Sequence, residues 1–333
     1  MSPLQRRRFI GTLSQSSIAS AVALCATPSL LWAQASKKNY LGAKLRIVIP
    51  ANTRTSLDLT GRALGDALVG VGVCDEVDYE NLDGKGGTTG LTSYVAKYGS
   101  DPNTFLIGGM ALLGATAVHK SAIDLTRVQP LARLTSEALT IVVANASPLR
   151  TINDLVARLR ASPKQVGMGG GFIGSEDHLF AGLLVRAAGA KPEDIAYTPY
   201  SAAFQLVDAV ATGKTIAGIS GYGTFHDEIT SGKLRALGVS SKKTTFGIKS
   251  LREQGVEVDL VNWRGIFTGQ AVSAARQAEL IEGIRAATAY SLWEKTIKQA
   301  RWEPYWLTGP NLVSFLDIEQ KTANVLVQLL KLG

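Results

Sequence analysis

The sequence is poor in the side chains that hold metals or form disulfides: its 333 residues include two cysteines and three histidines. Cys25 and Cys74 are too few for a disulfide framework or a cysteine-rich zinc site. His119, His178 and His226 lie far apart and never in the HExxH spacing of zinc enzymes. We therefore predict neither a bound metal nor a cofactor.

Excess charge of one sign is also scarce. The formal net charge is +8, and three arginines at residues 6–8 contribute three of these charges, which leaves only +5 for the rest. The basic residues are scattered rather than gathered in a patch, so we expect no nucleic-acid partner. With 46% hydrophobic and 19% charged residues the composition is that of a globular protein, and the length favours two domains.

Residues 1–35 contain no acidic side chain and have the pattern of an export signal. A basic head is followed by an apolar stretch rich in small residues, and residues 33–35 (AQA) offer the small-x-small site of signal peptidase. The run RRRF at residues 6–9 also fits a twin-arginine signal, although Gln5 leaves ordinary secretion open. Serine, threonine and proline interrupt the apolar stretch, which argues against a membrane anchor. We expect cleavage after about Ala35 and a location in the periplasm.

After residue 36, apolar strands alternate with amphipathic helices. Expected strands are residues 45–49, 104–107, 139–144, 195–198, 215–220 and 234–240. The first helix is expected from about Asp58, capped by Ser56 or Asp58, and the chain from Ser273 onward is expected to be mainly helical. Thr151-x-x-Asp154 predicts a capping box. Repeated βα units with apolar strands predict an α/β fold with mostly parallel sheets covered on both faces.

The loop of residues 52–58 follows the first expected strand. Its backbone amides and hydroxyl groups can face an anion at the start of a helix. Arg54 can form a bidentate pair with a carboxylate, although a capped turn with a solvated Arg54 explains the pattern equally well.

The glycine-rich residues 167–175 let the backbone approach a ligand closely. Gly169-x-Gly171-x-x-Gly174 also matches the nucleotide-binding pattern GxGxxG. Glu176 and Asp177 would repel a pyrophosphate there, whereas a carboxylate held farther out by Ser175 is less penalised. Asp177 and His178 are expected to brace this loop.

A third glycine-flexed turn, residues 220–223, contains Tyr222, which either borders a ligand or packs beneath the loop. Nucleophilic catalysis has little support. Ser220 does not stand in a GxSxG pattern, and Ser175, Asp177 and His178 are too close in sequence to form a triad. We therefore predict a binding protein rather than an enzyme.

The order of these segments resembles the substrate-binding receptors of tripartite tricarboxylate transporters, also called Bug-type receptors. The likeness covers roughly residues 45–320. It rests on IVIPAN and LDLTGRALGDAL (47–68), YEN and GKGGTTGL (79–91), GGM (108–110), ARLTSEALTIVV (132–143), GGG and GSEDHLFAGLL (169–184), GISGYGTF (218–225), GKLRALGVSS (232–241) and NWRGIF (262–267).

The resemblance implies an α/β, two-lobed periplasmic binding protein of a type II-like fold, each lobe a mostly parallel sheet flanked by helices. Lobe 1 would comprise residues 36–138 and 264–333, and lobe 2 residues 139–263. The lobes would close on a small organic carboxylate, and the loaded monomer would dock on the integral membrane permease subunits of the transporter.

The family also implies which residues grip the ligand, largely through backbone amides and ordered water, with Thr55 and Gly170 facing one another across the cleft. The expected ligand-binding residues are Asn52, Arg54, Thr55, Ser56, Asp58, Met110, Gly170, Gly171, Gly174, Ser175, Tyr200 and Tyr222.

Two segments depart from the family pattern. The first loop carries Arg54, Thr55 and Ser56 where glycines are usual, and residues 201–204 (SAAF) replace a second glycine segment. Either a direct Arg54 contact replaces backbone contacts, or the pocket admits a ligand other than a tricarboxylate. Two alternatives remain: a nucleotide-dependent oxidoreductase that uses residues 169–174, and a receptor that signals through a sensor protein instead of feeding a permease.

Overall fold

The structure is a computed structural model that describes residues 40–332, so the predicted export signal and its cleavage site lie outside the described residues. The strands are β1 (Lys44–Ile49), β2 (Glu76–Asn81), β3 (Thr104–Gly109), β4 (Val128–Ala144), β5 (Gly167–Gly170), β6 (Ala196–Pro199), β7 (Ala217–Gly221), β8 (Leu234–Val239), β9 (Val261–Gly269) and β10 (Glu303–Leu307). The helices are α1 (Ser56–Gly70), α2 (Thr88–Tyr98), α3 (Met110–Val118), α4 (Ile152–Ala161), α5 (Glu176–Ala187), α6 (Ala203–Ala211), α7 (Tyr222–Thr230), α8 (Ala274–Thr288), α9 (Ser291–Gln299) and α10 (Gly309–Leu329). None of these helices is long and apolar enough to cross a membrane.

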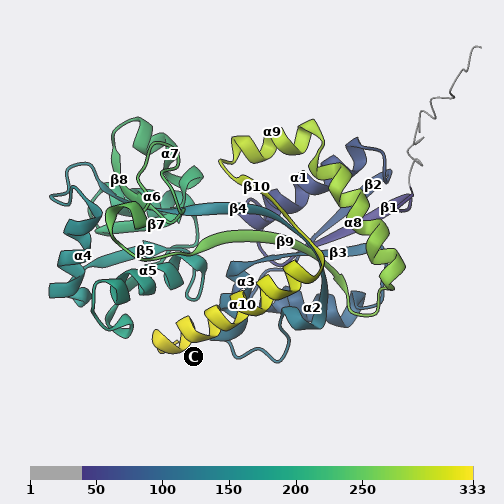
Figure 1. Cartoon of the computed structure of the whole chain (residues 1–333), viewed down its shortest axis with the longest axis horizontal. Coiled ribbons are helices and arrows are strands. Elements are labelled where there is room, and N and C mark those ends of the chain that lie inside the picture. The colour runs from purple at the N-terminus through teal and green to yellow at the C-terminus, as the bar shows by residue number, and fades with distance from the viewer. Residues whose placement is uncertain (1–39, 333) are drawn as a thin grey trace, which may run out of the picture. The chain divides into compact units, whose positions relative to one another are not determined.

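Two lobes are built on one hydrogen-bonded strand order, β2-β1-β3-β9-β4-β7-β5-β6, with β8 and β10 paired to β4. The long strands β4 and β9 run through the middle of the structure, between the lobes (Figure 1). Ala138 of β4 pairs with Val261 of β9, and the next residue, Leu139, pairs with Gly221 of β7. Strand β4 therefore passes directly from the sheet of one lobe into the sheet of the other.

The sheets are mixed. Parallel pairs join β1 to β2 and β3, and β5 to β6 and β7, whereas every pairing of β4 or β9 is antiparallel. The prediction of mostly parallel sheets thus describes the outer strands of each lobe. The pair of β4 and β9 is antiparallel because the chain crosses from the first lobe to the second along β4 and returns along β9.

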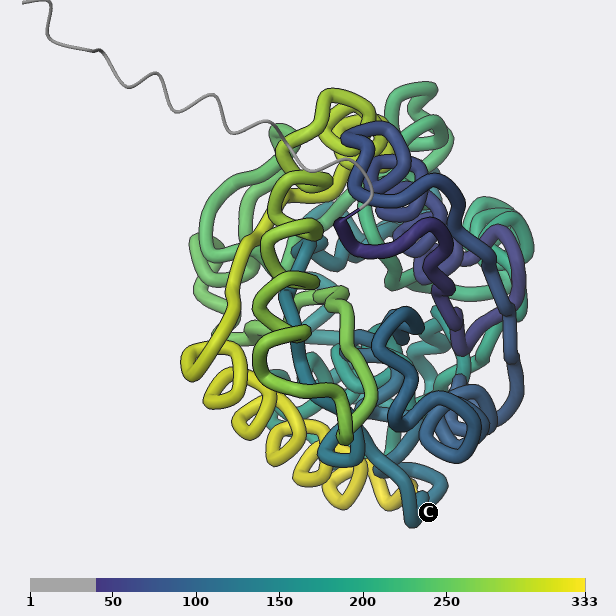
Figure 2. Tube along the Cα trace, turned by 90° about the vertical axis from the view of Figure 1, so that its right-hand side faces the viewer, coloured from purple at the N-terminus to yellow at the C-terminus, as the bar shows by residue number. Residues whose placement is uncertain are grey.

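The first lobe is held together by segments from both ends of the described chain. Helices α8 and α9 pack against α1, and Figure 2 shows the yellow-green C-terminal helices returning beside the purple start of the chain. Their shared core includes Leu64 of α1, Ile47 of β1 and Trp293 of α9. Helix α10 packs against α3 and also against α5, where Leu330 lies over Gly182.

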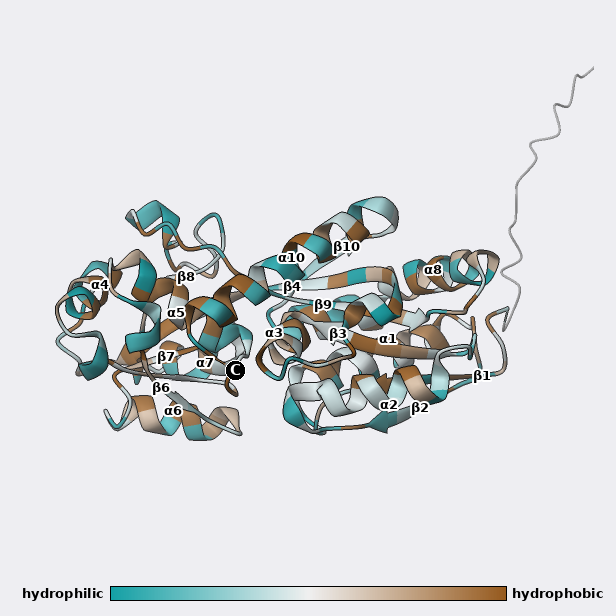
Figure 3. Cartoon of the chain, turned by 90° about the horizontal axis from the view of Figure 1, so that it is seen from below, coloured by the Kyte–Doolittle hydropathy of each residue, from teal (hydrophilic) through white to brown (hydrophobic). Residues whose placement is uncertain are grey.

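The hydrophobic positions of each lobe gather between its helices and its strands (Figure 3). In the second lobe a compact cluster joins Val142 of β4, Leu206 and Val210 of α6 and Phe225 of α7. Each cluster excludes water from one face of a helix, so the strand ends and the loops beyond them have rigid supports.

Helix ends follow the sequence signals with one correction. The capping box of Thr151 and Asp154 is confirmed at the start of α4. Helix α1 is capped by Thr55, not by the predicted Ser56 or Asp58, and begins at Ser56. The reason is that Thr55 has the extended backbone a capping residue needs, and its side chain accepts the amide of Asp58.

Candidate functional site

The loop between β1 and α1 is fixed by a buried carboxylate. Asp58, 4% exposed, accepts hydrogen bonds from the Arg54 amide (2.8 Å), Arg62 Nε (2.9 Å) and Asn81 Nδ2 (2.9 Å). Burial alone would raise the pKa of Asp58, but the hydrogen bonds from these three donors hold it below its ordinary value. Asp58 is therefore a brace that ties the loop to α1 and to the end of β2.

The same loop ends in free backbone donors. Thr55 Oγ1 donates to the Asn52 carbonyl (2.9 Å) and accepts from the Asp58 amide (3.3 Å), which sets the first turn of α1. Within residues 40–332, no hydrogen bond accepts from the Ser56 or Leu57 amide. Because the helix dipole favours negative charge at this end, these amides form a place for an anion.

The glycine loop before α5 is braced from within, as predicted. Asp177 Oδ2 accepts from the Gly171 amide (2.8 Å), and His178 Nδ1 accepts from the Gly174 amide (3.1 Å). His178 is 2% exposed, and burial lowers its pKa to about 4, so the ring is neutral and can accept this bond at neutral pH. Ser175 caps α5 and accepts the His178 amide.

Close packing and backbone geometry account for the glycines of the GxGxxG pattern. A Cβ on Gly169 would lie 2.7 Å from the Tyr200 ring, and a Cβ on Gly171 would lie 3.0 Å from Ser175 Oγ. Gly174 has a φ of +90°, which a side chain disfavours. Glycine at these positions therefore lets β5, the glycine loop and their neighbours pack closely together.

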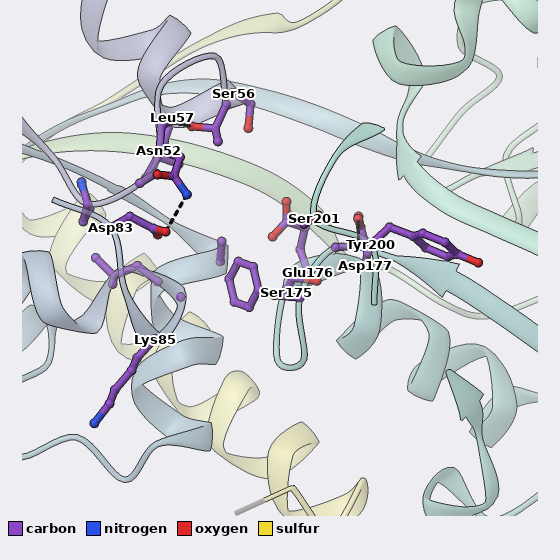
Figure 4. Close-up of a pocket in the computed structure, with 18 residues that line it drawn as sticks. Asn52, Ser56, Leu57, Asp83, Lys85, Ser175, Glu176, Asp177, Tyr200 and Ser201 are labelled. Carbon is purple, nitrogen blue, oxygen red and sulfur yellow. Dashed lines mark hydrogen bonds between the residues drawn. The ribbon is translucent and has the colours of Figure 1, made fainter. Parts of the chain in front are cut away.

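The two loops meet at a cavity of about 370 Å³ between the lobes. Its walls are Pro50, Ala51, Asn52, Thr55, Ser56, Leu57, Asp83, Lys85, Gly86, Ala111 and Leu112 from the first lobe, and Gly171, Phe172, Ser175, Glu176, Asp177, Tyr200 and Ser201 from the second. Figure 4 shows Asn52, Ser56 and Leu57 on one side and Glu176, Asp177 and Ser201 on the other. Both α1 and α5 begin at this cavity.

Acidic groups outnumber basic groups in the cavity wall. Lys85, an exposed residue, carries its ammonium away from the other labelled side chains (Figure 4). Asp83 accepts from Asn52 Nδ2 (2.6 Å). Burial raises the pKa of Glu176, and burial together with the neighbouring Glu176 raises that of Asp177 well above its ordinary value.

The strands that connect the lobes carry a buried ion pair. Arg264 of β9 is fully buried and donates to Glu137 of β4, which also accepts from Asn262 Nδ2 (3.3 Å). The Arg264 guanidinium lies over the Trp302 ring at 4.1 Å. Burial raises the pKa of Glu176 and of Asp177, and the positive charge of Arg264 acts to lower it, but the carboxylate to which Arg264 donates is that of Glu137.

Six of the twelve residues expected to bind ligand line this cavity: Asn52, Thr55, Ser56, Gly171, Ser175 and Tyr200. Tyr200 contributes little of its ring, because its hydroxyl group is bonded to Thr215 Oγ1 (2.6 Å) away from the cavity. Thr55 and Gly171 both line the cavity, whereas the expected Gly170, the last residue of β5, does not.

The other expected residues lie elsewhere. Asp58 and Gly174 shape the loops, and Met110 is fully buried at the start of α3. Tyr222 is packed, with its ring stacked on Phe246 at 4.2 Å.

Arg54 lines a neighbouring groove of about 530 Å³ that shares only Thr55 and Ser56 with the cavity. Arg54 therefore borders this groove and not the cavity at which α1 begins.

Sequence reasoning missed the contribution of the segment after β2. Asp83, Lys85 and Gly86 line the cavity because β2 is parallel to β1, so both strands end at the same edge of the sheet. Strand β2 reads EVDYEN, with acids between its apolar residues, which hid it from a search for apolar strands. No group of three or more metal-binding side chains gathers anywhere in the described part of the chain.

Comparison with known proteins gives one family. Residues 73–332 match the model of the tripartite tricarboxylate transporter family receptor. Protein BugT of Bordetella pertussis is 26% identical over 234 residues, which cover 67% of this chain and 69% of BugT.

Two solved structures from Rhodopseudomonas palustris share the fold. MatC, with bound malate, is 17% identical with a TM-score of 0.69, over 86% of this chain and 98% of MatC. Rpa4515, with adipate, is 17% identical with a TM-score of 0.72, over 87% of this chain and 98% of Rpa4515. At this identity the likeness concerns the two-lobed fold.

Proposed function

The chain belongs to the tripartite tricarboxylate transporter family of receptors, and from this premise we propose that it captures a small organic carboxylate in the cavity between its lobes. The observation that carries the proposal is the pair of free amides, Ser56 and Leu57, that begin α1 at the cavity wall. A carboxylate there gains charge-assisted hydrogen bonds and the favourable end of the helix dipole. Malate in MatC and adipate in Rpa4515 support the same class of solute.

Lobe closure is the proposed mechanism. Because residues of both lobes line the cavity, the solute touches all of them only when the lobes are together, and it therefore stabilises the closed state. Moving the equilibrium from about 1:99 to 99:1 takes about 5.5 kcal/mol of differential affinity. Micromolar binding supplies about 8 kcal/mol in total.

The two lobes are proposed to divide where β4 changes sheets, with residues 36–138 and 264–333 in lobe 1 and residues 139–263 in lobe 2. The change of pairing partner between Ala138 and Leu139 supports this division. Helix α10 packs against α3 of lobe 1 and α5 of lobe 2, so its packing would change when the lobes move relative to one another.

The proposed contacts are the six expected residues that line the cavity, together with Glu176 and Asp177. Arg54 reaches only a solute that extends past Thr55 and Ser56 into the neighbouring groove. The proposed role is binding, not catalysis. The export-signal pattern and the family support a periplasmic location, with the loaded monomer docking on membrane permease subunits.

A thermal-shift panel tests the proposal. Ligand-stripped protein is heated with mono-, di- and aromatic carboxylates, each beside its neutral amide. A carboxylate at one hundred times its Kd adds about 2.7 kcal/mol of stability, which raises Tm by about 5 °C. No shift with any carboxylate, or equal shifts with the amides, would contradict the proposal.

A further inference from the structure

Two buried carboxyl oxygens at the start of α5 have no hydrogen-bond partner among residues 40–332: Glu176 Oε2 and Asp177 Oδ1. Both residues line the cavity between the lobes. The Asp177 side chain is only 6% exposed, so this acceptor is almost fully withdrawn from bulk water. Buried acceptors in proteins are nearly always paired, and an unpaired one destabilises the fold.

No donor of the described chain bonds to either oxygen, and two buried donors of Arg264, Nε and Nη1, are themselves unpartnered. The Gly171 amide bonds to the other oxygen of Asp177, and Arg264 bonds to Glu137. Lys85 carries its ammonium away from the cavity centre (Figure 4). A solute that enters the cavity can therefore supply the donor that Glu176 Oε2 and Asp177 Oδ1 lack.

The balance of charge indicates what kind of donor fits. Three carboxyl groups, Glu137, Glu176 and Asp177, share one buried guanidinium, that of Arg264. Burial and mutual repulsion raise the pKa of Asp177 and disfavour a further negative group beside it. A positive or neutral donor is favoured at this end, whereas the free amides of Ser56 and Leu57 favour an anion at the other end.

We propose that the solute carries, besides its carboxylate, an ammonium or hydroxyl group that donates to Glu176 and Asp177. This rests on the proposed function and narrows the solute to amino- or hydroxy-carboxylates. The carboxylate binds at the start of α1 in one lobe, and the donor binds at the start of α5 in the other. The solute thus connects the lobes through two different kinds of contact, and Glu176 determines the preference for substituted over plain acids.

Matched ligand series test this assignment by isothermal titration calorimetry. The series are propionate, lactate and alanine; succinate, malate and aspartate; and glutarate, 2-hydroxyglutarate and glutamate. Members of one series differ only in the group on the second carbon. In the series that fits the cavity, the hydroxy or amino acid binds at least tenfold more tightly than the plain acid, and the better of the two identifies the donor.

Glu176→Gln keeps the size of the side chain and removes its charge, and Glu176→Ala removes the acceptor. Both variants reduce the preference for the substituted acid toward onefold, while the plain acid retains its affinity. Glu257→Gln is the control, because it neutralises an exposed acid of the second lobe that does not line the cavity. It keeps the preference. Thermal unfolding of each variant confirms that it is folded.

The outcomes distinguish the preference for a substituted acid from carboxylate binding itself. Plain acids that bind as tightly as substituted ones overturn this inference and leave the proposed function standing. A preference that survives in both Glu176 variants also overturns it. If no acid of any series binds while the wider carboxylate panel gives a thermal shift, this inference fails and the proposed function stands; if that panel is also silent, both fail.

Discussion

His178 shows how a single residue supports the cavity without reaching it. Its ring is stacked on Tyr197 at 4.1 Å between centroids, and its Nδ1 accepts the Gly174 amide next to the cap of α5. Protonation would remove this acceptor and leave a buried cation. The hydrogen bond that holds the glycine loop therefore depends on the protonation state of His178, and hence on pH.

The pH dependence of stability follows from this burial. The unfolded chain protonates a histidine near pH 6.5, whereas the folded chain holds His178 neutral to about pH 4. Between these values the unfolded state binds more protons, so stability falls as pH drops. From pH 7 to pH 5 this histidine accounts for a loss of about 2 kcal/mol. Urea unfolding of wild type and His178→Asn, which keeps an acceptor but does not titrate, measures the difference. Identical pH dependence in both proteins would refute the assignment.

Individual site residues were predictable where a sequence pattern implies a backbone position. Thr55 and Ser56 stand between an apolar strand and an amphipathic helix, and both line the cavity. Met110 was expected there from its position in the family pattern, and Tyr222 as the aromatic residue of a glycine-flexed turn, for which packing beneath the loop was the alternative. Their side chains are packed in the interior, because an apolar or aromatic residue beside a strand end gains more from burial than from facing water.

Among the elements, α4 offers a test of how far local stability and binding are separable. Its capping box joins Thr151 and Asp154, whose carboxylate accepts the Thr151 amide at 2.8 Å. Backbone hydrogen bonds at this helix start lower the pKa of Asp154. None of these residues lines the cavity.

Thr151→Ala removes the cap, and we expect the free energy of unfolding to fall by about 1 kcal/mol. The affinity for a carboxylate should not change, because α4 is remote from the cavity wall. Urea denaturation and calorimetric titration of the same preparations measure both quantities. A tenfold loss of affinity in this variant would show that α4 contributes to the site.

Strands β2 and β4 explain why the element order was only partly predictable. Residues 139–144 of β4 are an apolar run and were expected, but residues 128–138 include Arg133, Ser136 and Glu137. Two of these buried side chains have neighbours that favour a charge: Arg133 lies over the Tyr305 ring at 3.9 Å, and Glu137 pairs with Arg264. Such pairing is a property of the folded chain and leaves no apolar pattern in the sequence.

For the whole molecule, the connection between lobes depends on β4 and β9. The ion pair of Glu137 and Arg264 joins these strands just where β4 leaves one sheet for the other. Removing one partner of such a buried pair is strongly destabilising, so we expect substitution of Glu137 or Arg264 to weaken the connection between the lobes.

Closure around a carboxylate is the central claim, and small-angle X-ray scattering tests it most directly. The radius of gyration is measured for ligand-stripped protein and again with a saturating concentration of the carboxylate that gives the largest thermal shift. We expect it to decrease on binding, and to remain unchanged with the matched neutral amide. An unchanged radius of gyration at saturation with the carboxylate would contradict the account.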